Sequence, residues 1–92
     1  MELRVRKVED RSRYELMEGD TVVGIAEFTI EGDTVVFPHT VIDPDRRGEG
    51  LGAILTQGAL DDVRPTGRKV VPVCWYVAKF IDTHLGYADL LA

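Results

Sequence analysis

A stretch rich in glycine and arginine, DRRGEGLGA at 45–53, carries the densest set of residues that could do chemistry. Its alternating glycines let a backbone approach a ligand without interference from Cβ atoms, and its arginines add positive charge to an acidic chain. It precedes a predicted helix, whose first amides lack partners and suit a phosphate or pyrophosphate. The alternative is that Gly48 and Gly50 only form a tight turn. The candidate ligand-binding residues are Arg46, Arg47, Gly48, Glu49, Gly50, Leu51, Gly52 and Ala53.

Two familiar phosphate-binding patterns do not account for this stretch. The P-loop needs Gly-Lys followed by Ser or Thr, and the sequence contains no such triplet. Residues 48–53 fit the relaxed dinucleotide-binding pattern, but that fold needs an acidic residue about 20 positions later, where Arg68 and Lys69 stand. Both named folds are therefore set aside.

The single cysteine, Cys74, is the strongest candidate for a reacting side chain. It lies between a predicted strand and a helix that begins near Trp75, and a helix N-terminus stabilises a thiolate. Cys74 could act as a nucleophile or as a general acid. The alternative is a small buried hydrophobic residue, which is a common role for a lone cysteine.

His39 and Tyr76 are further candidates for proton transfer. His39 is expected to share a strand face with Val35, Phe37 and Val41, where its ring could act as a base near neutral pH or be a structural histidine. Tyr76 could donate a proton to a leaving group or simply pack. No metal site is expected, because one cysteine and two widely separated histidines show no ligand spacing.

The first half of the sequence predicts an antiparallel meander of four strands. Apolar and polar residues alternate in short runs, and short connections between them favour antiparallel neighbours. The runs lie near 3–8, 14–18, 22–30 and 34–42. The third run is expected to place on one face Val22, Gly24, Ala26, Phe28 and Ile30.

The second half predicts two helices with a strand between them. Apolar residues at 51, 54, 55 and 59 follow the spacing of one helical face and predict a helix over 51–63. A buried strand from Arg68 to Cys74 and a helix from Trp75 to about His84 follow. The predicted fold class is therefore α+β, a mixed and mostly antiparallel sheet of about five strands with a strand-helix-strand unit and a C-terminal helix.

Pro72 conflicts with a central position for the last strand. Proline lacks the N–H donor that a ladder between two neighbours needs. The conflict disappears if this strand diverges from the fourth strand, or if it lies at the edge of the sheet.

Length and charge fit one acidic domain over residues 1–92. The chain has 11 Lys plus Arg against 16 Asp plus Glu, a formal net charge of −5. This balance argues against nucleic acid, whose binding needs clustered Lys and Arg, and favours a cationic partner. No apolar stretch approaches the roughly 20 residues that cross a bilayer, so no membrane partner is expected. One cysteine and no secretory leader pattern lead us to expect a cytoplasmic protein.

These features together resemble the GNAT superfamily of acetyl-coenzyme A dependent N-acetyltransferases, in its small single-domain branch. Arg47-x-x-Gly50-x-Gly52, between a strand and a helix, looks like the acetyl-coenzyme A signature of that superfamily. The surrounding residues are similar as an ordered set. They are HTV at 39–41, RGEGLG at 47–52, VPVCWYV at 71–77, FI at 80–81 and YADL at 87–90.

The resemblance implies how backbone groups bind the coenzyme. In the superfamily, amides that follow the signature arginine bind the pyrophosphate, which here implies the backbone of Arg47, Gly48, Gly50, Gly52 and Ala53. The strand before the loop binds the pantetheine arm by main-chain hydrogen bonds, which falls on Thr40, Val41 and Ile42. A backbone N–H of the same strand is our candidate donor to the oxyanion formed during acyl transfer.

The implied activity is transfer of an acetyl group from acetyl-coenzyme A, the cosubstrate, to a protein lysine, a polyamine or a small amine. Transfer could be direct, because holding two substrates together can supply about 7–11 kcal/mol, or could pass through Cys74. Larger members have N-terminal helices that shape the acceptor pocket, so here we expect an open site or one completed by a homodimer or another partner. The alternatives are a non-catalytic module that binds or senses acyl-coenzyme A, and a small interaction domain without a ligand.

Overall fold

The computed structural model describes residues 2–92 and confirms the expected α+β fold. Five strands form one sheet in the order β1-β2-β3-β4-β5. The first four pair antiparallel with their neighbours, and the fifth pairs parallel with β4. The strands are β1 (Leu3–Val8), β2 (Arg13–Glu18), β3 (Thr21–Glu31), β4 (Thr34–Ile42) and β5 (Lys69–Val71).

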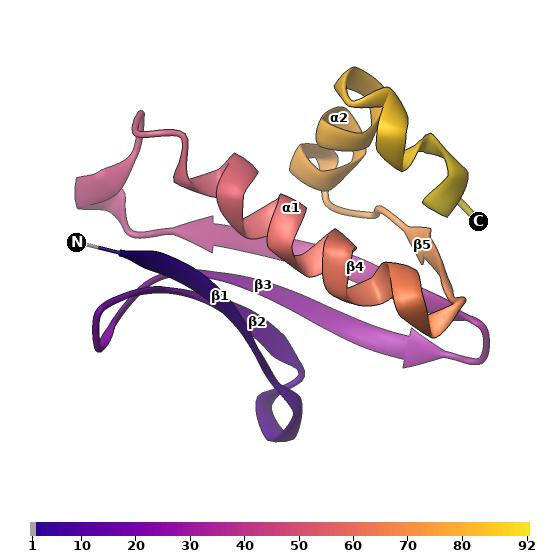
Figure 1. Cartoon of the computed structure of the whole chain (residues 1–92), viewed down its shortest axis with the longest axis horizontal. Helices are drawn as coiled ribbons and strands as arrows, with labels where there is room; N and C mark the ends of the chain where they lie inside the picture. The colour runs from indigo at the N-terminus through magenta and orange to yellow at the C-terminus, as the bar shows by residue number, and fades with distance from the viewer. Residues whose placement is uncertain (1) are drawn as a thin grey trace.

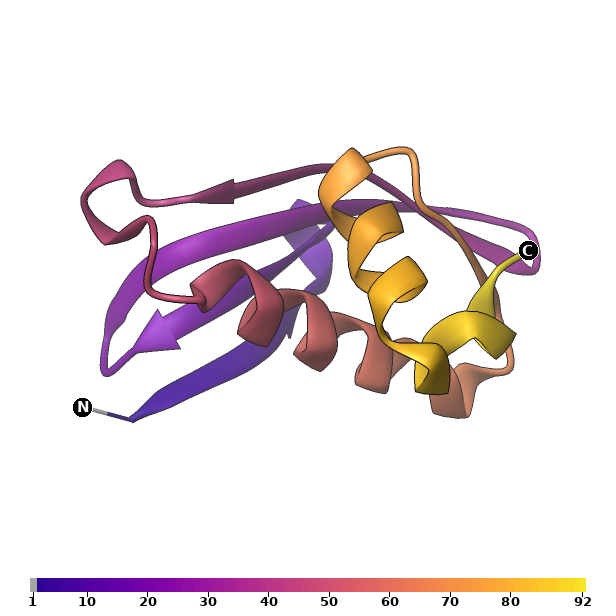
Figure 2. The same ribbon diagram turned by 90° about the horizontal axis from the view of Figure 1, so that it is seen from above.

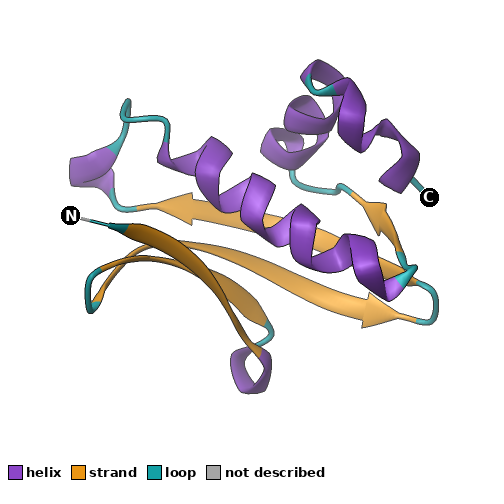
Figure 3. Ribbon diagram, viewed as in Figure 1, coloured by secondary structure: helices purple, strands orange, loops and turns teal. Residues whose placement is uncertain are grey.

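Two α-helices complete the fold, α1 (Leu51–Val63) and α2 (Trp75–Thr83). Helix α1 runs across one face of the sheet (Figures 1 and 3), and α2 lies beside α1 and β4 (Figure 2). Both helices were predicted, and α1 ends before Pro65, whose ring disfavours a helical interior. Short 3-10 turns are η1 (Glu9–Arg11), η2 (Pro44–Arg46), η3 (Arg64–Thr66) and η4 (Leu85–Leu90).

The hydrophobic core lies between α1 and the face of the sheet that it covers. Leu16 of β2, Phe37 of β4, Leu55 of α1 and Val70 of β5 are each no more than 1% exposed. Burying a side chain of this kind contributes roughly 1.5–3 kcal/mol. The core therefore fixes the start of α1 relative to β4, which is where the glycine-rich loop lies.

A bulge in β3 corrects the face predicted for the start of that strand. Gly24 is buried as expected, but Val22 is exposed and Val23 is buried instead. Leu16 pairs with Gly24, and the next residue, Met17, pairs with Val22, so Val23 is an extra residue in the ladder. One extra residue moves the neighbouring side chain to the opposite face.

A second bulge, at Phe37-Pro38 in β4, determines the face on which His39 lies. The register between β3 and β4 shifts there by one residue, and proline supplies no N–H to the ladder. Beyond the bulge, Thr40 pairs with the buried Ala26 and lies on the core side, so His39 points to the opposite face of the sheet. The prediction that His39 shares a face with Phe37 is wrong, because it assumed unbroken alternation.

The last strand is shorter than the predicted 68–74. It ends at Val71, because a tight turn centred on Pro72 brings the Val73 N–H within 3.1 Å of the Val71 carbonyl. It pairs with β4 over 34–36 and lies at the edge of the sheet. One further backbone bond joins Cys74 to Phe37, and beyond it the two segments separate. Both interpretations of Pro72, divergence and an edge position, therefore hold.

Candidate functional site

The loop between β4 and α1 depends on two glycines with a left-handed backbone. Gly48 has a φ of 85° and Gly50 a φ of 77°, a region that costs other residues roughly 1–2 kcal/mol. A Cβ atom at either position would meet nothing within 4 Å. Backbone conformation, and not crowding, is therefore what requires glycine at these two positions.

None of the seven backbone amides of residues 47–53 donates a hydrogen bond to any part of residues 2–92. The first amide that does so is that of Ile54, which donates to the Gly50 carbonyl at 3.4 Å. Unpaired amides at a helix N-terminus, together with the helix dipole, form a favourable site for an anion. The last three of these amides, those of Leu51, Gly52 and Ala53, belong to the first turn of α1.

Gly52 has a different role from the first two glycines, because it packs against Tyr76. A Cβ atom at position 52 would lie 2.8 Å from both Cζ and Oη of Tyr76. Tyr76 belongs to the first turn of α2. The absence of a side chain at Gly52 therefore allows the starts of α1 and α2 to meet at the loop.

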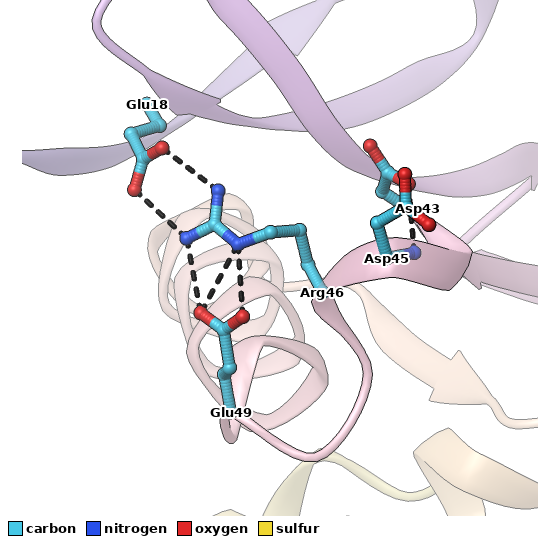
Figure 4. Close-up of polar contacts among 5 residues, drawn as sticks. All are labelled: Glu18, Asp43, Asp45, Arg46 and Glu49. Atoms are coloured by element: carbon cyan, nitrogen blue, oxygen red, sulfur yellow. Dashed lines mark hydrogen bonds and ion pairs between the residues drawn. The ribbon is translucent and has the colours of Figure 1, made fainter.

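Arg46 does not supply free positive charge to the loop, contrary to the prediction. Its guanidinium donates two hydrogen bonds to Glu18 at 2.8 and 2.9 Å and also contacts Glu49 at 3.0–3.1 Å (Figure 4). These contacts with the glutamates raise the pKa of Arg46, and the guanidinium lowers the pKa of Glu18. Arg46 therefore ties the loop to the end of β2, where Glu18 lies. At the start of the same loop, the Asp43 side chain accepts a hydrogen bond from the Asp45 amide at 3.0 Å.

Arg47 is the loop arginine whose charge is not neutralised within residues 2–92. Its side chain is exposed, and it forms no ion pair with the carboxylates of the described chain. The positive charge predicted for this loop is thus reduced from two arginines to one.

A cavity of about 610 Å³ lies where the loop, β4 and the start of α2 meet. It is lined by residues of 39–42, 46–52 and 74–76, and it brings together every predicted site residue except Glu49 and Ala53. Glu49 is turned toward Arg46, and Ala53 lies one step further along α1. The structure thus gathers into one cavity residues that are up to 37 positions apart, from His39 to Tyr76 (76 − 39 = 37).

The edge of β4 on the cavity side is unpaired beyond Phe37. The Cys74 amide donates to the Phe37 carbonyl at 2.8 Å, and residues 39–42 then pair only with β3 on the other side. Within the described chain, the Thr40 hydroxyl oxygen is buried without a hydrogen-bond partner. An unpaired strand edge can hold an extended ligand through main-chain hydrogen bonds.

Cys74 and Tyr76 lie at this cavity, whereas the His39 side chain belongs to the other face of the sheet. Cys74 is half-buried and stands at the N-cap of α2. Tyr76 is half-buried against Gly52. His39 is exposed and reaches the cavity only where the edge of β4 forms its rim.

The comparisons with known proteins give the family. A model of the GCN5-related N-acetyl-transferase family matches residues 13–90. The chain belongs to this family. A comparison with curated protein sequences gave no significant match.

Two solved structures share the fold of this GCN5-related N-acetyltransferase family member. A GCN5-like protein from Staphylococcus aureus aligns with a TM-score of 0.75 and 14% identity, over 98% of this chain and 88% of that chain. The ribosomal-protein-S18-alanine N-acetyltransferase from Escherichia coli aligns with a TM-score of 0.61 and 20% identity, over 65% of this chain. The aligned part is 39% of the Escherichia coli enzyme.

Two residues of the family member's site were not predicted from the sequence. Trp75 lines the cavity with its side chain 72% exposed and its ring edge-on to Tyr76 at 5.8 Å. Its position between Cys74 and Tyr76 in the sequence could have identified it as a site residue. Glu18 lies 28 residues from Arg46, and no local pattern connects the two.

Residues 2–92 form neither a membrane-spanning helix nor a cluster of metal ligands. None of the helices over residues 2–92 has the length and apolar character that a membrane crossing requires. Within the same residues, no group of three or more His, Cys, Asp or Glu side chains is placed to hold a metal ion.

Proposed function

We propose that this protein binds acetyl-coenzyme A in the cavity of about 610 Å³ and transfers the acetyl group to a primary amine. One observation carries the proposal. The unpaired amides of the loop, the unpaired edge of β4 and the Cys74 side chain all border the same cavity. These three features match a ligand that has a diphosphate at one end, an extended arm in the middle and a reactive thioester at the other end.

The donor groups at the cavity fit the coenzyme. The amides of Gly50, Leu51 and Gly52 would donate to the pyrophosphate, with the helix dipole and Arg47 offsetting its charge. The backbone of residues 40–42 would hold the pantetheine arm along the strand edge. The unpartnered Thr40 hydroxyl is a buried polar group that a ligand here could satisfy.

The chemistry follows from this placement. The nitrogen of a neutral amine attacks the thioester carbonyl carbon, an N–C bond forms, and the C–S bond breaks as the coenzyme leaves as a thiolate. The proton that the nitrogen loses passes to solvent water. A backbone N–H of residues 40–42 would donate to the oxyanion, and Cys74 or Tyr76 would protonate the thiolate. In the variant route, the Cys74 thiolate attacks first and the coenzyme leaves as a thiolate. The amine then attacks the Cys74 thioester, whose C–S bond breaks to release the Cys74 thiolate.

A coenzyme-binding module without turnover is the second candidate function. It is favoured by the position of His39, the predicted base, whose side chain lies on the face of β4 away from Thr40.

The negative charge of the chain, −5, favours cationic amines such as lysine side chains or polyamines as acceptors in the catalytic case.

Two measurements test the proposal in sequence. Calorimetry with coenzyme A tests binding, and ligand at 100 times its Kd should stabilise the fold by about 2.7 kcal/mol. Mass spectrometry of products, after incubation with labelled acetyl-coenzyme A and a panel of lysine peptides and polyamines, tests transfer. Binding without any acetylated product favours the module, and absence of binding refutes both functions.

A further inference from the structure

Lys79 is a cation beside the loop that the proposed function does not yet use. It lies on α2, three residues after Tyr76, and residues three apart share one side of a helix. Tyr76 itself contacts Gly52 at the start of α1. Within residues 2–92, Lys79 is exposed and forms no ion pair with a carboxylate.

A second cavity, of about 160 Å³, lies at this lysine and next to the loop cavity. Tyr76 lines both cavities. The small one is also lined by Ala53, whose amide is one of the seven without a partner, and no carboxylate of residues 2–92 lines it. Its lining residues are Ala53, Tyr76, Lys79, Phe80, Thr83 and His84.

The polar groups of this small cavity select an anion. The Thr83 hydroxyl is occupied, because it donates to the Lys79 carbonyl at 2.9 Å. The His84 Nδ1 lies 2.7 Å from the Phe80 carbonyl, which can only accept, so Nδ1 carries the proton and the Nε2 of the neutral ring is an acceptor that does not serve an anion. The groups that can donate to an anion here therefore include the Lys79 ammonium and the amide of Ala53.

We propose that Lys79, with the Ala53 amide, forms a subsite for the phosphate monoester on the ribose of coenzyme A. This inference rests on the proposed function, because it places the ribose phosphate beside the loop that would bind the pyrophosphate. Coenzyme A carries this phosphate on its ribose 3′-oxygen, one sugar away from the pyrophosphate. Arg46 cannot serve it, since its guanidinium is held by Glu18 and Glu49.

The test compares coenzyme A with 3′-dephospho-coenzyme A, which keeps the pyrophosphate and the pantetheine arm. Calorimetry would measure both ligands on the wild-type chain, on Lys79→Gln and on the control Lys7→Gln, which removes the same charge from β1 at a site remote from the loop. We expect the wild type to bind coenzyme A about tenfold more tightly than the dephospho form. The ratio should fall toward one in Lys79→Gln and stay unchanged in Lys7→Gln.

The outcomes separate this subsite from the proposed function. If the wild type binds both ligands equally, the subsite is refuted while coenzyme binding stands. If the tenfold preference survives in Lys79→Gln, another group binds the ribose phosphate and the assignment is wrong. If neither ligand binds, the proposed function itself fails and the subsite fails with it.

Discussion

The replacement Gly50→Ala tests the loop most directly, because the chain offers a matched control. Gly50 has a φ of 77° and Gly67 a φ of 76°, and an added Cβ would meet nothing within 4 Å at either position. Gly50 precedes α1, whereas Gly67 follows η3, beyond the other end of α1, which spans roughly 20 Å at 1.5 Å per residue. The two replacements therefore impose the same backbone strain at opposite ends of one helix.

Both variants should lose similar stability. An alanine at this φ costs roughly 1–2 kcal/mol, and the lower entropy of the unfolded alanine chain returns about 0.4–1 kcal/mol of that. We therefore expect a net loss of about 1 kcal/mol and a fall in Tm of roughly 4–8 °C in each variant, measured by thermal unfolding. The replacement Gly50→Asn should be milder, because asparagine tolerates the left-handed region.

Only Gly50→Ala should weaken coenzyme A binding. Relief of the strain rotates the peptide that carries the Leu51 amide, one of the unpaired donors of the loop. Loss of about one charge-assisted hydrogen bond corresponds to a Kd at least about tenfold higher by calorimetry. Equal weakening in Gly67→Ala, or normal affinity in a destabilised Gly50→Ala, would refute the reasoning that these amides hold the pyrophosphate.

Three further predictions concern side chains. Arg46→Met should raise the Kd for coenzyme A about three- to tenfold and leave the Kd for pantetheine unchanged, because it frees the loop from Glu18 without touching β4. Calorimetry with both ligands checks this, and equal weakening of the two ligands would contradict it. Cys74→Ala should lower acetyl transfer at least about tenfold with nearly unchanged coenzyme affinity, measured by product mass spectrometry, and undiminished turnover would remove Cys74 from the mechanism. Hydrogen bonds from Arg6, together with Arg13, lower the pKa of the buried Glu15 below its usual 4.5. The ionised Glu15 therefore stabilises the fold above pH 4.5, and this contribution is lost as the pH falls through the pKa of Glu15 in the folded state. Urea unfolding between pH 3 and 7 should show this loss in the wild type and a flatter profile, with lower stability at pH 7, in Glu15→Gln.

Much of the architecture could be read from local patterns. The alternation of apolar and polar residues predicted the four antiparallel strands, and helical spacing predicted α1 over 51–63, as the structure has it. These patterns are reliable because each element must bury one face, and the spacing of side chains on that face is fixed by backbone geometry. The loop was likewise visible in the sequence, since its glycines and its place before a helix are local features.

The errors arose where pairing between strands overrides local alternation. His39 was assigned to the wrong face, because the bulge at Phe37-Pro38 exists only in the register between β3 and β4. The last strand was predicted too long, because the turn at Pro72 ends it at Val71. In both places a proline was the visible signal, since it withdraws a ladder donor, but its outcome depends on what lies alongside.

The sequence by itself determined that the chain carries an amide-rich loop between a strand and a helix, and that Cys74 stands at the start of another helix. Only the tertiary structure decided that Glu18, 28 residues away, holds Arg46, and that the starts of α1 and α2 meet where Gly52 leaves room for Tyr76. The physical reason is the separation along the chain between the residues that interact. Backbone conformation and helix starts are set by neighbouring residues, whereas a long charged side chain takes whichever partner the packed fold brings within a few ångströms of it.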